Sequence, residues 1–454
     1  MKKIVVIGGG AAGAKAASKA KRLNPLNHVE LYTNEDKIAY SLCGLPYFIE
    51  GSVEKIENLI IRTPQDFINN GIQVFLNHNL EKIIPEKNCV LINNNHIFYD
   101  ELILALGASV NIPNINNISA NNIFTLRSLE SGLKIKEKMQ NSKTVLIIGG
   151  GYIAIELTEA FIKNGLNVKL VEIKDRLASD FDDDFSKVIQ NIISSYCSDK
   201  FDLYLSQSID EIFVDENNNF KSAKTNKGNI IEADFCVLST GCRPNVEIPK
   251  NSGIKLGITG AIYVDEKLRT NYPNIYACGD CTEKHCIITR QPTYIGLGTI
   301  ANKEGRVAAI NAVNDDNYEI FDGVLKSTIT RFFDYTISKT GLSVNEALSY
   351  SDRINIAPVS STITKKDKAG YMPDSNELTL KLVADKRSGE ILGAQAIGKM
   401  GNVAQRINTI TSIIKTRSKV DDLLHLDLPY APPYSGTIDP VLTAAYKLKE
   451  LINK

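Results

Sequence analysis

The stretch Ile4-Val5-Val6-Ile7-Gly8-Gly9-Gly10-Ala11-Ala12-Gly13, near the start of the chain, decides the fold. Its continuous apolar run is typical of a strand buried on both faces of a parallel sheet. The glycines follow as G-x-G-x-x-G, before a helix expected over about residues 14–23. Gly8 makes the tight turn, Gly10 lets a pyrophosphate approach the backbone, and Gly13 lets the helix pack on the strand. The stretch predicts a Rossmann-like dinucleotide-binding unit.

The second strand of this unit is expected over residues 28–32. In dinucleotide-binding units such a strand ends in an acid that binds the adenosine ribose. Here the strand runs into Thr33-Asn34-Glu35. The ribose contact is therefore made either by Thr33 or by a shifted Glu35.

The opening pattern recurs as Thr144-Val-Leu-Ile-Ile-Gly149-Gly-Gly151-Tyr-Ile-Ala154, and the next strand ends in Glu172. An acid at this place hydrogen-bonds the ribose diol of NAD and repels the 2′-phosphate of NADP. Lys174 and Arg176 follow closely, so NADH is the expected cofactor and NADPH stays possible. Two dinucleotide units in one chain indicate two dinucleotides, and the economical pair is a bound FAD beside a nicotinamide site.

Three further strands complete the two units. Residues 102–108 form a buried strand that ends at Gly107, in the FAD unit, and residues 235–241 form its counterpart, which ends at Gly241, in the NAD(P)H unit. The third strand, residues 274–280, ends in Gly279-Asp280. A carboxylate placed there can reach the ribityl hydroxyls of FAD, so Asp280 is a predicted FAD ligand.

The segment Tyr40-Ser-Leu-Cys43-Gly-Leu-Pro-Tyr47 follows the first crossover and predicts a redox-active cysteine. A helix N-terminus or an adjoining oxidised cofactor can favour the reactive thiolate at neutral pH. The other cysteines are expected to be reduced and structural. The pair Cys278-x-x-Cys281 is not expected to bind metal, because no second ligand pair follows it.

The amino-acid composition limits the kinds of partner that we expect for this protein. The chain has 454 residues, with 52 basic and 52 acidic side chains. Without a basic block we expect neither nucleic acid nor a membrane surface as partner. No apolar run reaches the ~18 residues of a membrane span, and a strand follows Met1 directly, so we expect a cytoplasmic protein.

From residue 326 the pattern changes to alternating strands, a helix from Gly401 to about Lys415, and a tail rich in proline and tyrosine. The predicted fold class is α/β, with two Rossmann-like domains and a C-terminal α+β interface domain. The expected domains are residues 1–115 with 250–325 for FAD, 116–249 for NAD(P)H, and 326–454 for dimerisation.

These features resemble the FAD-dependent pyridine nucleotide-disulfide oxidoreductases along essentially the whole chain. The two-cysteine members carry C-x4-C, but the positions five residues from Cys43 are Ile38 and Phe48. The resemblance is therefore to the single-cysteine branch, in which the cysteine is held as a sulfenic acid, a mixed disulfide or a persulfide.

Within that branch, oxidases and peroxidases carry a histidine in the first glycine loop, where this chain has Ala11. Cys-Gly-Leu-Pro-Tyr at residue 43 and Tyr-Ala-Pro-Pro-Tyr at residue 430 resemble coenzyme A-disulfide reductases and NADH-dependent persulfide reductases. The resemblance implies a homodimer, with Tyr371 and Tyr430 reaching the partner's disulfide. It also implies that Lys19 and Arg22 contact coenzyme A phosphates.

The same resemblance assigns residues on the second helix: Tyr152 gates the nicotinamide pocket and Glu156 lines it. The sequence departs from the coenzyme A-disulfide reductase pattern just before the cysteine. The reductases have Ser-Phe-x-Asn-Cys where this chain has Ala39-Tyr-Ser-Leu-Cys43, and this difference weakens the assignment of coenzyme A as substrate. Coenzyme A disulfide, a persulfide and a polysulfide all stay open as substrates. The alternative is an NADH oxidase or peroxidase that uses a Cys43 sulfenic acid.

Overall fold

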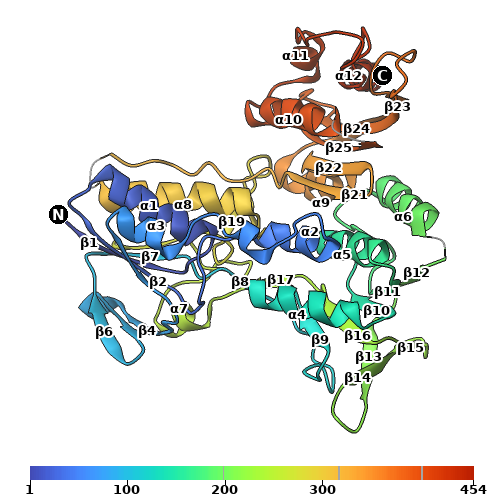
Figure 1. Ribbon diagram of the computed structural model, residues 1–454. Helices are drawn as coiled ribbons and strands as arrows, with labels where there is room; N and C mark the ends of the chain where they lie inside the picture. Colours follow the sequence, from blue (N-terminus) through green and yellow to red (C-terminus); the bar gives the residue numbers. More distant parts are fainter. Residues whose placement is uncertain (198, 315–316, 400–401) are drawn as a thin grey trace.

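The structure is a computed structural model that describes residues 1–197, 199–314, 317–399 and 402–454. It contains two units built on parallel sheets and a third unit, on an antiparallel sheet, toward the C-terminus (Figure 1). The predicted fold class is confirmed. Within the described ranges, none of the helices combines the length and the apolar character that a membrane span requires.

The first unit is a five-stranded parallel sheet in the order β18-β7-β1-β2-β3. Its central strand is buried on both faces, and four successive apolar residues, 4–7, form the buried part of that strand. The last strand in sequence lies at one edge, so the unit is assembled from two separate parts of the chain. The strands are β1 (Lys3–Ile7), β2 (His28–Tyr32), β3 (Ile72–Phe75), β7 (Glu101–Leu104) and β18 (Ile275–Ala277).

Helices cover this sheet, and α1 and α8 pack tightly side by side (Figure 1). The first helix begins at Ala11, three residues before the predicted start, because the glycine loop leads straight into it. The helices of this unit are α1 (Ala11–Leu23), α3 (Pro64–Asn69), α7 (Glu247–Asn251) and α8 (Gly298–Val313). A small antiparallel sheet of β4 (Leu80–Ile84), β5 (Cys89–Ile92) and β6 (Asn95–Phe98) lies beside them. The helix α2 (Leu45–Glu50) packs instead in the hydrophobic core of the second unit.

The second unit repeats the arrangement with the strand order β12-β11-β10-β16-β9. All its pairs are parallel, as expected for a second dinucleotide unit. Its elements are β9 (Ile123–Thr125), α4 (Leu129–Gln140), β10 (Thr144–Ile148), α5 (Tyr152–Lys163), β11 (Asn167–Glu172), α6 (Asp183–Cys197), β12 (Phe201–Leu205) and β16 (Phe235–Leu238), with a meander of β13 (Ile209–Val214), β14 (Phe220–Thr225) and β15 (Ile230–Glu232).

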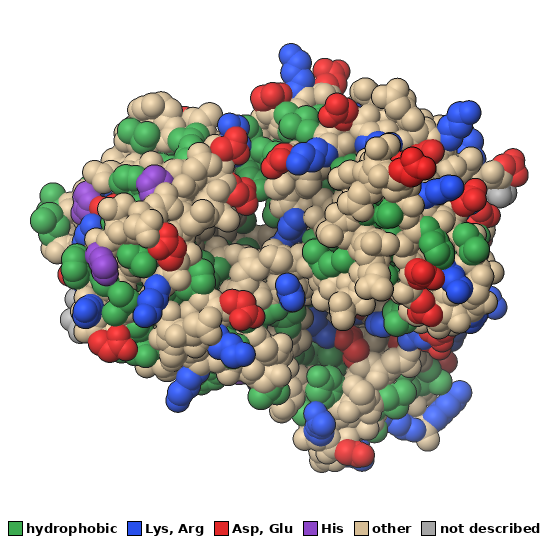
Figure 2. Space-filling view, turned by 90° about the horizontal axis from the view of Figure 1, so that it is seen from below, with side chains coloured by type: hydrophobic (Ala, Val, Ile, Leu, Met, Phe, Trp, Pro, Cys, Tyr) green, Lys and Arg blue, Asp and Glu red, His purple; other side chains and the backbone are tan. Residues whose placement is uncertain are grey.

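The two units are joined by short strands. The antiparallel pair β8 (Ala108–Val110) and β17 (Cys242–Pro244) crosses between them, and β19 (Lys284–His285) pairs with β20 (Pro292–Thr293). Viewed from below, the surface is hollowed between the left half, where the histidines of the first unit gather, and the right half (Figure 2). Acidic and basic side chains are interspersed over this face, in keeping with the balanced charge.

The third unit is an antiparallel sheet in the order β21-β22-β25-β24-β23. The sequence analysis did not predict β22, β23, α9, α11 and α12, and the predicted helix start at Gly401 lies outside the described residues. The elements are β21 (Thr328–Phe332), β22 (Tyr335–Gly341), α9 (Val344–Ile354), β23 (Pro358–Lys366), β24 (Glu377–Asp385), β25 (Ile391–Lys399), α10 (Asn402–Lys415), α11 (Val420–Leu424) and α12 (Pro440–Ile452).

Candidate active site

The first glycine loop has the geometry of a dinucleotide site. Gly8 has a φ of +113°, and a Cβ there would lie 2.1 Å from the carbonyl oxygen of Ala105. A Cβ on Gly13 would lie 1.9 Å from the Gly8 oxygen, so helix and strand pack as the sequence indicates. Gly10 instead faces open space, and α1 starts without a side-chain cap or an acid among its described first-turn residues. These backbone N–H groups fit a pyrophosphate.

A cavity of about 310 Å³ lies beside this loop and is lined in part by Gly8, Thr33 and Arg243. Of the two candidates for the ribose contact, Thr33 faces this cavity. Glu35 instead accepts a hydrogen bond from the hydroxyl of Tyr40 at 2.5 Å, in the segment that leads to the cysteine. The geometry therefore favours Thr33 at the ribose.

Asp280 follows β18 and points toward the junction of the two units. Its Oδ2 accepts a hydrogen bond from Nη2 of Arg127 at 3.0 Å, and its carbonyl oxygen accepts one from the hydroxyl of Tyr294 at 2.9 Å. Gly107 and Gly241 precede β8 and β17, and the two glycine carbonyls accept backbone hydrogen bonds across this pair of strands. Arg127 had no sequence signal, because it meets Asp280 from a distant part of the chain.

The second glycine loop repeats the first. Gly149 has a φ of +106°, a Cβ there would lie 2.2 Å from the Ser239 carbonyl oxygen, and Gly151 faces open space. Glu172 is buried at the end of β11, where its carboxylate accepts hydrogen bonds from the backbone N–H groups of Gly150, at 2.5 Å, and Lys174, at 2.7 Å. The carboxylate thus lies against the loop, which fits a second dinucleotide.

Tyr152 and Glu156 lie one turn apart on α5 and face strand β21 of the third unit. The Tyr152 hydroxyl donates to Oδ2 of Asp180 at 2.7 Å and lies 2.6 Å from the hydroxyl of Thr328. The hydroxyl of Thr330 donates to Glu156 at 2.7 Å. Burial raises the pKa of Glu156, and the Thr330 hydrogen bond opposes that effect. The third unit therefore fixes both side chains that the sequence placed at the nicotinamide.

Cys43 lies in a single 3-10 turn, Leu42–Gly44, directly before α2, and its side chain is exposed. Although the thiol reaches solvent, the protein around it displaces much of its water, and this desolvation raises its pKa. The carboxylates of Glu156 and Asp280 raise the pKa further, while the Arg127 guanidinium lowers it. Desolvation is the largest of these effects. The expectation that a helix N-terminus or an adjoining oxidised cofactor favours the thiolate stays a prediction.

The remaining cysteines divide into two groups. Six of the eight are buried, and the fully buried Cys278 and Cys281 are both free thiols. Cys242, also predicted to be structural, is exposed on β17, and its structural role stays a prediction. Among the described residues, no group of three or more His, Cys, Asp or Glu side chains is placed to hold a metal ion.

An ionic network joins the cysteine segment to the other two units. Glu50, at the end of α2, accepts two hydrogen bonds from Arg331 of β21, at 2.9 and 2.8 Å, and pairs with Lys163 of α5. Lys163 and Arg331 also pair with Glu159. Burial raises the pKa of Glu50, but Lys163 and Arg331 together hold it below its usual value. The network connects α2, the helix that follows Cys43, to α5 and β21.

A cavity of about 330 Å³ lies between α1 and α3, and its lining includes Lys21, Arg22, Arg62 and Phe67. The Arg62 guanidinium lies 4.3 Å from the centre of the Phe67 ring and donates to the Ser18 hydroxyl at 2.9 Å. The pKa of Arg62 is lowered by desolvation and by the nearby Arg22. The predicted substrate contact Arg22 lines this cavity, whereas Lys19, on the same helix, is not part of the lining.

Tyr371 and Tyr430 are brought together on the surface of the third unit. Their segments meet where the backbone N–H of Ala369 donates to the Pro432 carbonyl oxygen at 3.3 Å. Tyr371 is 74% exposed and Tyr430 is 50% exposed. Two large aromatic side chains held in solvent fit a surface that meets a second chain.

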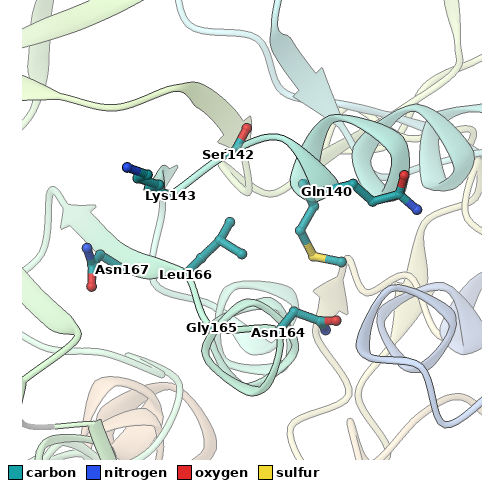
Figure 3. Close-up of a pocket in the computed structure, with 8 residues that line it drawn as sticks. Gln140, Ser142, Lys143, Asn164, Gly165, Leu166 and Asn167 are labelled. Atoms are coloured by element: carbon teal, nitrogen blue, oxygen red, sulfur yellow. The ribbon is translucent and has the colours of Figure 1, made fainter.

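Another cavity, of about 370 Å³, lies at the opposite end of the second sheet (Figure 3). Its lining comes from the ends of α4 and α5 and the starts of β10 and β11, and includes Gln140, Lys143, Asn164 and Asn167. None of the predicted site residues lies among its lining residues. Dinucleotides bind at the carboxyl ends of such strands, so this cavity is separate from the active site.

The geometry therefore shows two dinucleotide loops, the exposed Cys43 within electrostatic range of residues from both units, and a separate C-terminal unit. Residues 2–305 match the family model described as pyridine nucleotide-disulphide oxidoreductase. The chain belongs to this family. Residues 327–441 match the family's dimerisation domain. Pyridine nucleotide-disulphide oxidoreductases use FAD and NAD(P)H, and those are the cofactors of this oxidoreductase.

Two relatives and one solved structure show the range of the likeness. The oxidoreductase is 35% identical over 455 residues to an NAD(P)H sulfur oxidoreductase (CoA-dependent) of Pyrococcus furiosus, covering 99% of each chain. It is 31% identical over 461 residues to an NADH oxidase of Methanocaldococcus jannaschii, again covering 99% of each chain. A NAD-dependent persulfide reductase from A. fulgidus superimposes with a TM-score of 0.93 at 32% identity, covering 99% of this chain and 84% of that one.

Proposed function

We propose that this oxidoreductase reduces a disulfide or persulfide of coenzyme A, or of a related small thiol, with electrons from NAD(P)H and with Cys43 as its single redox-active cysteine. The observation that carries the proposal is the exposed thiol of Cys43, which lies within electrostatic range of both Asp280 and Glu156, from the first and second units. Ile38 and Phe48, where a C-x4-C partner would stand, are buried hydrophobic residues. A dithiol relay is thus excluded at this segment.

The cavity between α1 and α3 supports a nucleotide-bearing thiol as substrate. Lys21, Arg22 and Arg62 bring three cations to its wall, which suits phosphate groups, and Phe67 adds an apolar surface. A backbone connection leads from this cavity to the cysteine. Residues 59–61, directly before Arg62, pair with residues 39–41, at the start of the cysteine segment. The Ser41 N–H donates to the Leu59 carbonyl oxygen at 2.8 Å, and the Ile61 N–H donates to the Ala39 carbonyl oxygen at 2.9 Å.

Cys43 acts as the nucleophile in this reaction. Its thiolate forms a bond to one sulfur of the substrate, the substrate sulfur–sulfur bond breaks, and the leaving thiolate takes up a proton. FAD, when bound, supplies the two-electron relay between NAD(P)H and the cysteine. Two electrons and one proton then release the second sulfur species and restore the Cys43 thiolate. Arg127 stabilises that thiolate electrostatically, and Tyr152 and Glu156 line the nicotinamide side.

We also propose that the enzyme works as a cytoplasmic homodimer. The exposed Tyr371 and Tyr430 of one chain would then reach the Cys43 site of the other and protonate or hydrogen-bond a leaving thiolate. The proposed domains are residues 1–115 with 250–325 for FAD, 116–249 for NAD(P)H and 326–454 for dimerisation. NADH is the proposed preferred donor, because Glu172 lies where it would repel a 2′-phosphate.

An NADH oxidase or peroxidase is the second candidate, since one relative of similar identity bears that name. Ala11 disfavours it. This residue is exposed at the first glycine loop and its methyl group cannot donate a proton to a developing hydroxide. General acid help is typically worth ~10²- to 10⁴-fold, so oxygen and peroxide should be slow acceptors.

The deciding experiment follows NADH loss with oxygen, hydrogen peroxide, coenzyme A disulfide and coenzyme A persulfide in parallel. We expect the sulfur substrates to exceed oxygen and peroxide by at least tenfold. Cys43→Ser should abolish the sulfur activity while NADH still reduces the flavin, and the matched exposed cysteine variant Cys242→Ser should keep the activity. Fastest turnover with oxygen or peroxide, or sulfur activity in Cys43→Ser, would exclude the proposal.

A further inference from the structure

A buried ion pair lies directly behind the peptide that presents Asp280, and the proposed reaction does not use it. Lys284 is the first residue of β19 and Glu304 lies on α8. Their side chains are 1% and 0% exposed, and Nζ lies 3.4 Å from Oε2. Such a pair must be compensated by further hydrogen bonds, because taking two charges out of water is unfavourable.

Those hydrogen bonds converge on Gly279, the residue before Asp280. The Lys284 ammonium donates to the Gly279 carbonyl oxygen at 2.9 Å, and Oε2 of Glu304 accepts from the Gly279 N–H at 2.7 Å. The hydroxyl of Thr282 joins the pair. It accepts from Lys284 at 2.9 Å, and its own proton has two acceptors within reach, the Gly279 carbonyl oxygen at 2.9 Å and Oε2 of Glu304 at 3.1 Å. Both polar groups of the Gly279 backbone are thus bound by opposite charges.

The backbone next to the pair also packs against the other wall of the flavin site. Gly279 has a φ of +82°, and a Cβ there would lie 2.9 Å from the Cβ of Ala12, in the first turn of α1. A Cβ on Gly305, next to Glu304, would lie 2.2 Å from the Ala12 carbonyl oxygen. The first turn of α1, the Gly279 turn and α8 therefore pack as one block, which links the pyrophosphate loop to Asp280.

The arrangement is poor for stability alone. Oε1 of Glu304 is buried without a hydrogen-bond partner among the described residues, and burial raises the pKa of this carboxyl. Apolar residues of similar volume often replace buried ion pairs without loss of stability. A charged pair with one unsatisfied oxygen, directed at one peptide, instead points to a positioning role.

We propose that Lys284 and Glu304 are positioning residues that hold the Gly279–Asp280 peptide in the conformation that binds FAD, so that the pair sets the affinity for the flavin. The action is indirect, because Asp280 and the glycine loop make the contacts to FAD. The inference concerns cofactor binding and does not depend on which sulfur compound is the substrate.

Two double variants of equal charge test the proposal. Lys284→Met with Glu304→Gln removes both charges but keeps an acceptor for the Gly279 N–H. Lys284→Met with Glu304→Met removes the acceptor as well. After the flavin is stripped, we expect the Met/Met protein to bind FAD at least about tenfold more weakly than the Met/Gln protein, the factor typical of a hydrogen bond to a well-placed acceptor. Binding is measured by quenching of FAD fluorescence, with circular dichroism to show that both proteins are folded.

The control is another buried pair, Lys381 and Asp182, which lie 3.1 Å apart with both side chains 6% exposed. Lys381→Met with Asp182→Asn should lower the melting temperature but leave the FAD dissociation constant within twofold of the wild type. A ratio below threefold between the Met/Gln and Met/Met proteins, or an equal loss of FAD affinity in the control, overturns the proposal.

If the Met/Met protein does not fold, Thr282→Val decides. This isosteric change removes only the bridging hydroxyl, and we expect the FAD dissociation constant to rise at least threefold; an unchanged constant overturns the proposal. A double-mutant cycle that combines these variants with Asp280→Asn tests whether the pair affects FAD affinity through Asp280. Because the pair acts through Asp280, its effect on FAD affinity should shrink at least threefold in the Asp280→Asn background, and full additivity would exclude that route.

Discussion

Arg62→Met should separate recognition of the nucleotide from the chemistry at the cysteine. The guanidinium is half-buried at the cavity between α1 and α3, where methionine keeps the apolar contact with Phe67. The variant loses a half-buried cation–π contact of about 0.5–1 kcal/mol and a hydrogen bond to Ser18 of about 0.5–1.5 kcal/mol, so the stability loss is about 1–2.5 kcal/mol. A hydrogen bond from a charged group to phosphate contributes about 1.5–3 kcal/mol to binding. The site is open to solvent, so we take the lower end of this range and expect kcat/KM for the nucleotide-bearing disulfide to fall about tenfold.

The assay compares kcat/KM for coenzyme A disulfide with that for pantetheine disulfide, which has the same thiol arm but no nucleotide. We expect Arg62→Met to lower the first about tenfold and to leave the second within twofold. Arg417→Met, which removes an exposed guanidinium paired with Glu390 in the third unit, is the matched control and should change neither. The wild-type preference for the nucleotide should also weaken at high salt. Equal losses on both disulfides, or no loss on either, would refute a nucleotide site in this cavity.

Asp280→Ala should yield largely flavin-free protein by absorbance, and a wild type that cannot be reconstituted with FAD would contradict the assignment of the first unit. Glu172→Gln, which removes the charge but keeps an acceptor, should raise kcat/KM for NADPH relative to NADH about tenfold; an unchanged ratio would refute that role. In flavin-free protein, the rate of Cys43 alkylation should rise with pH, and the midpoint of that rise should lie above the ~8.5 of free cysteine. Glu156→Gln should shift the midpoint to lower pH, because the Glu156 carboxylate contributes to the raised pKa of the thiol. A midpoint below that of free cysteine would contradict this prediction. Arg331→Met should destabilise the protein by about 1–2 kcal/mol. This is less than the loss expected on breaking a fully buried ion pair, because the Arg331 side chain is 39% exposed. An unchanged melting temperature would show that the network contributes nothing to stability.

The sequence by itself determined the two dinucleotide units and the position of the cysteine. Both glycine loops could be found because strand, turn and helix follow one another within about a dozen residues, so that local backbone geometry fixes the site. The strands at residues 28–32 and 167–172 coincide with the predicted ones for the same reason. The α/β class and the separate C-terminal unit follow from the change of periodicity near residue 326.

Only the tertiary structure decided what surrounds those elements. Arg127 meets Asp280 across 153 positions of sequence, and Thr330 meets Glu156 across 174. No spacing rule predicts such pairs, because they depend on how the sheets are stacked and how the third unit packs on α5. The direction of the Cys43 pKa has the same origin: a thiol in a local motif is predicted to ionise easily, but desolvation and carboxylates from other segments raise its pKa. Local spacing therefore identified the reactive group, whereas its electrostatic environment was set by residues that come together only when the chain folds.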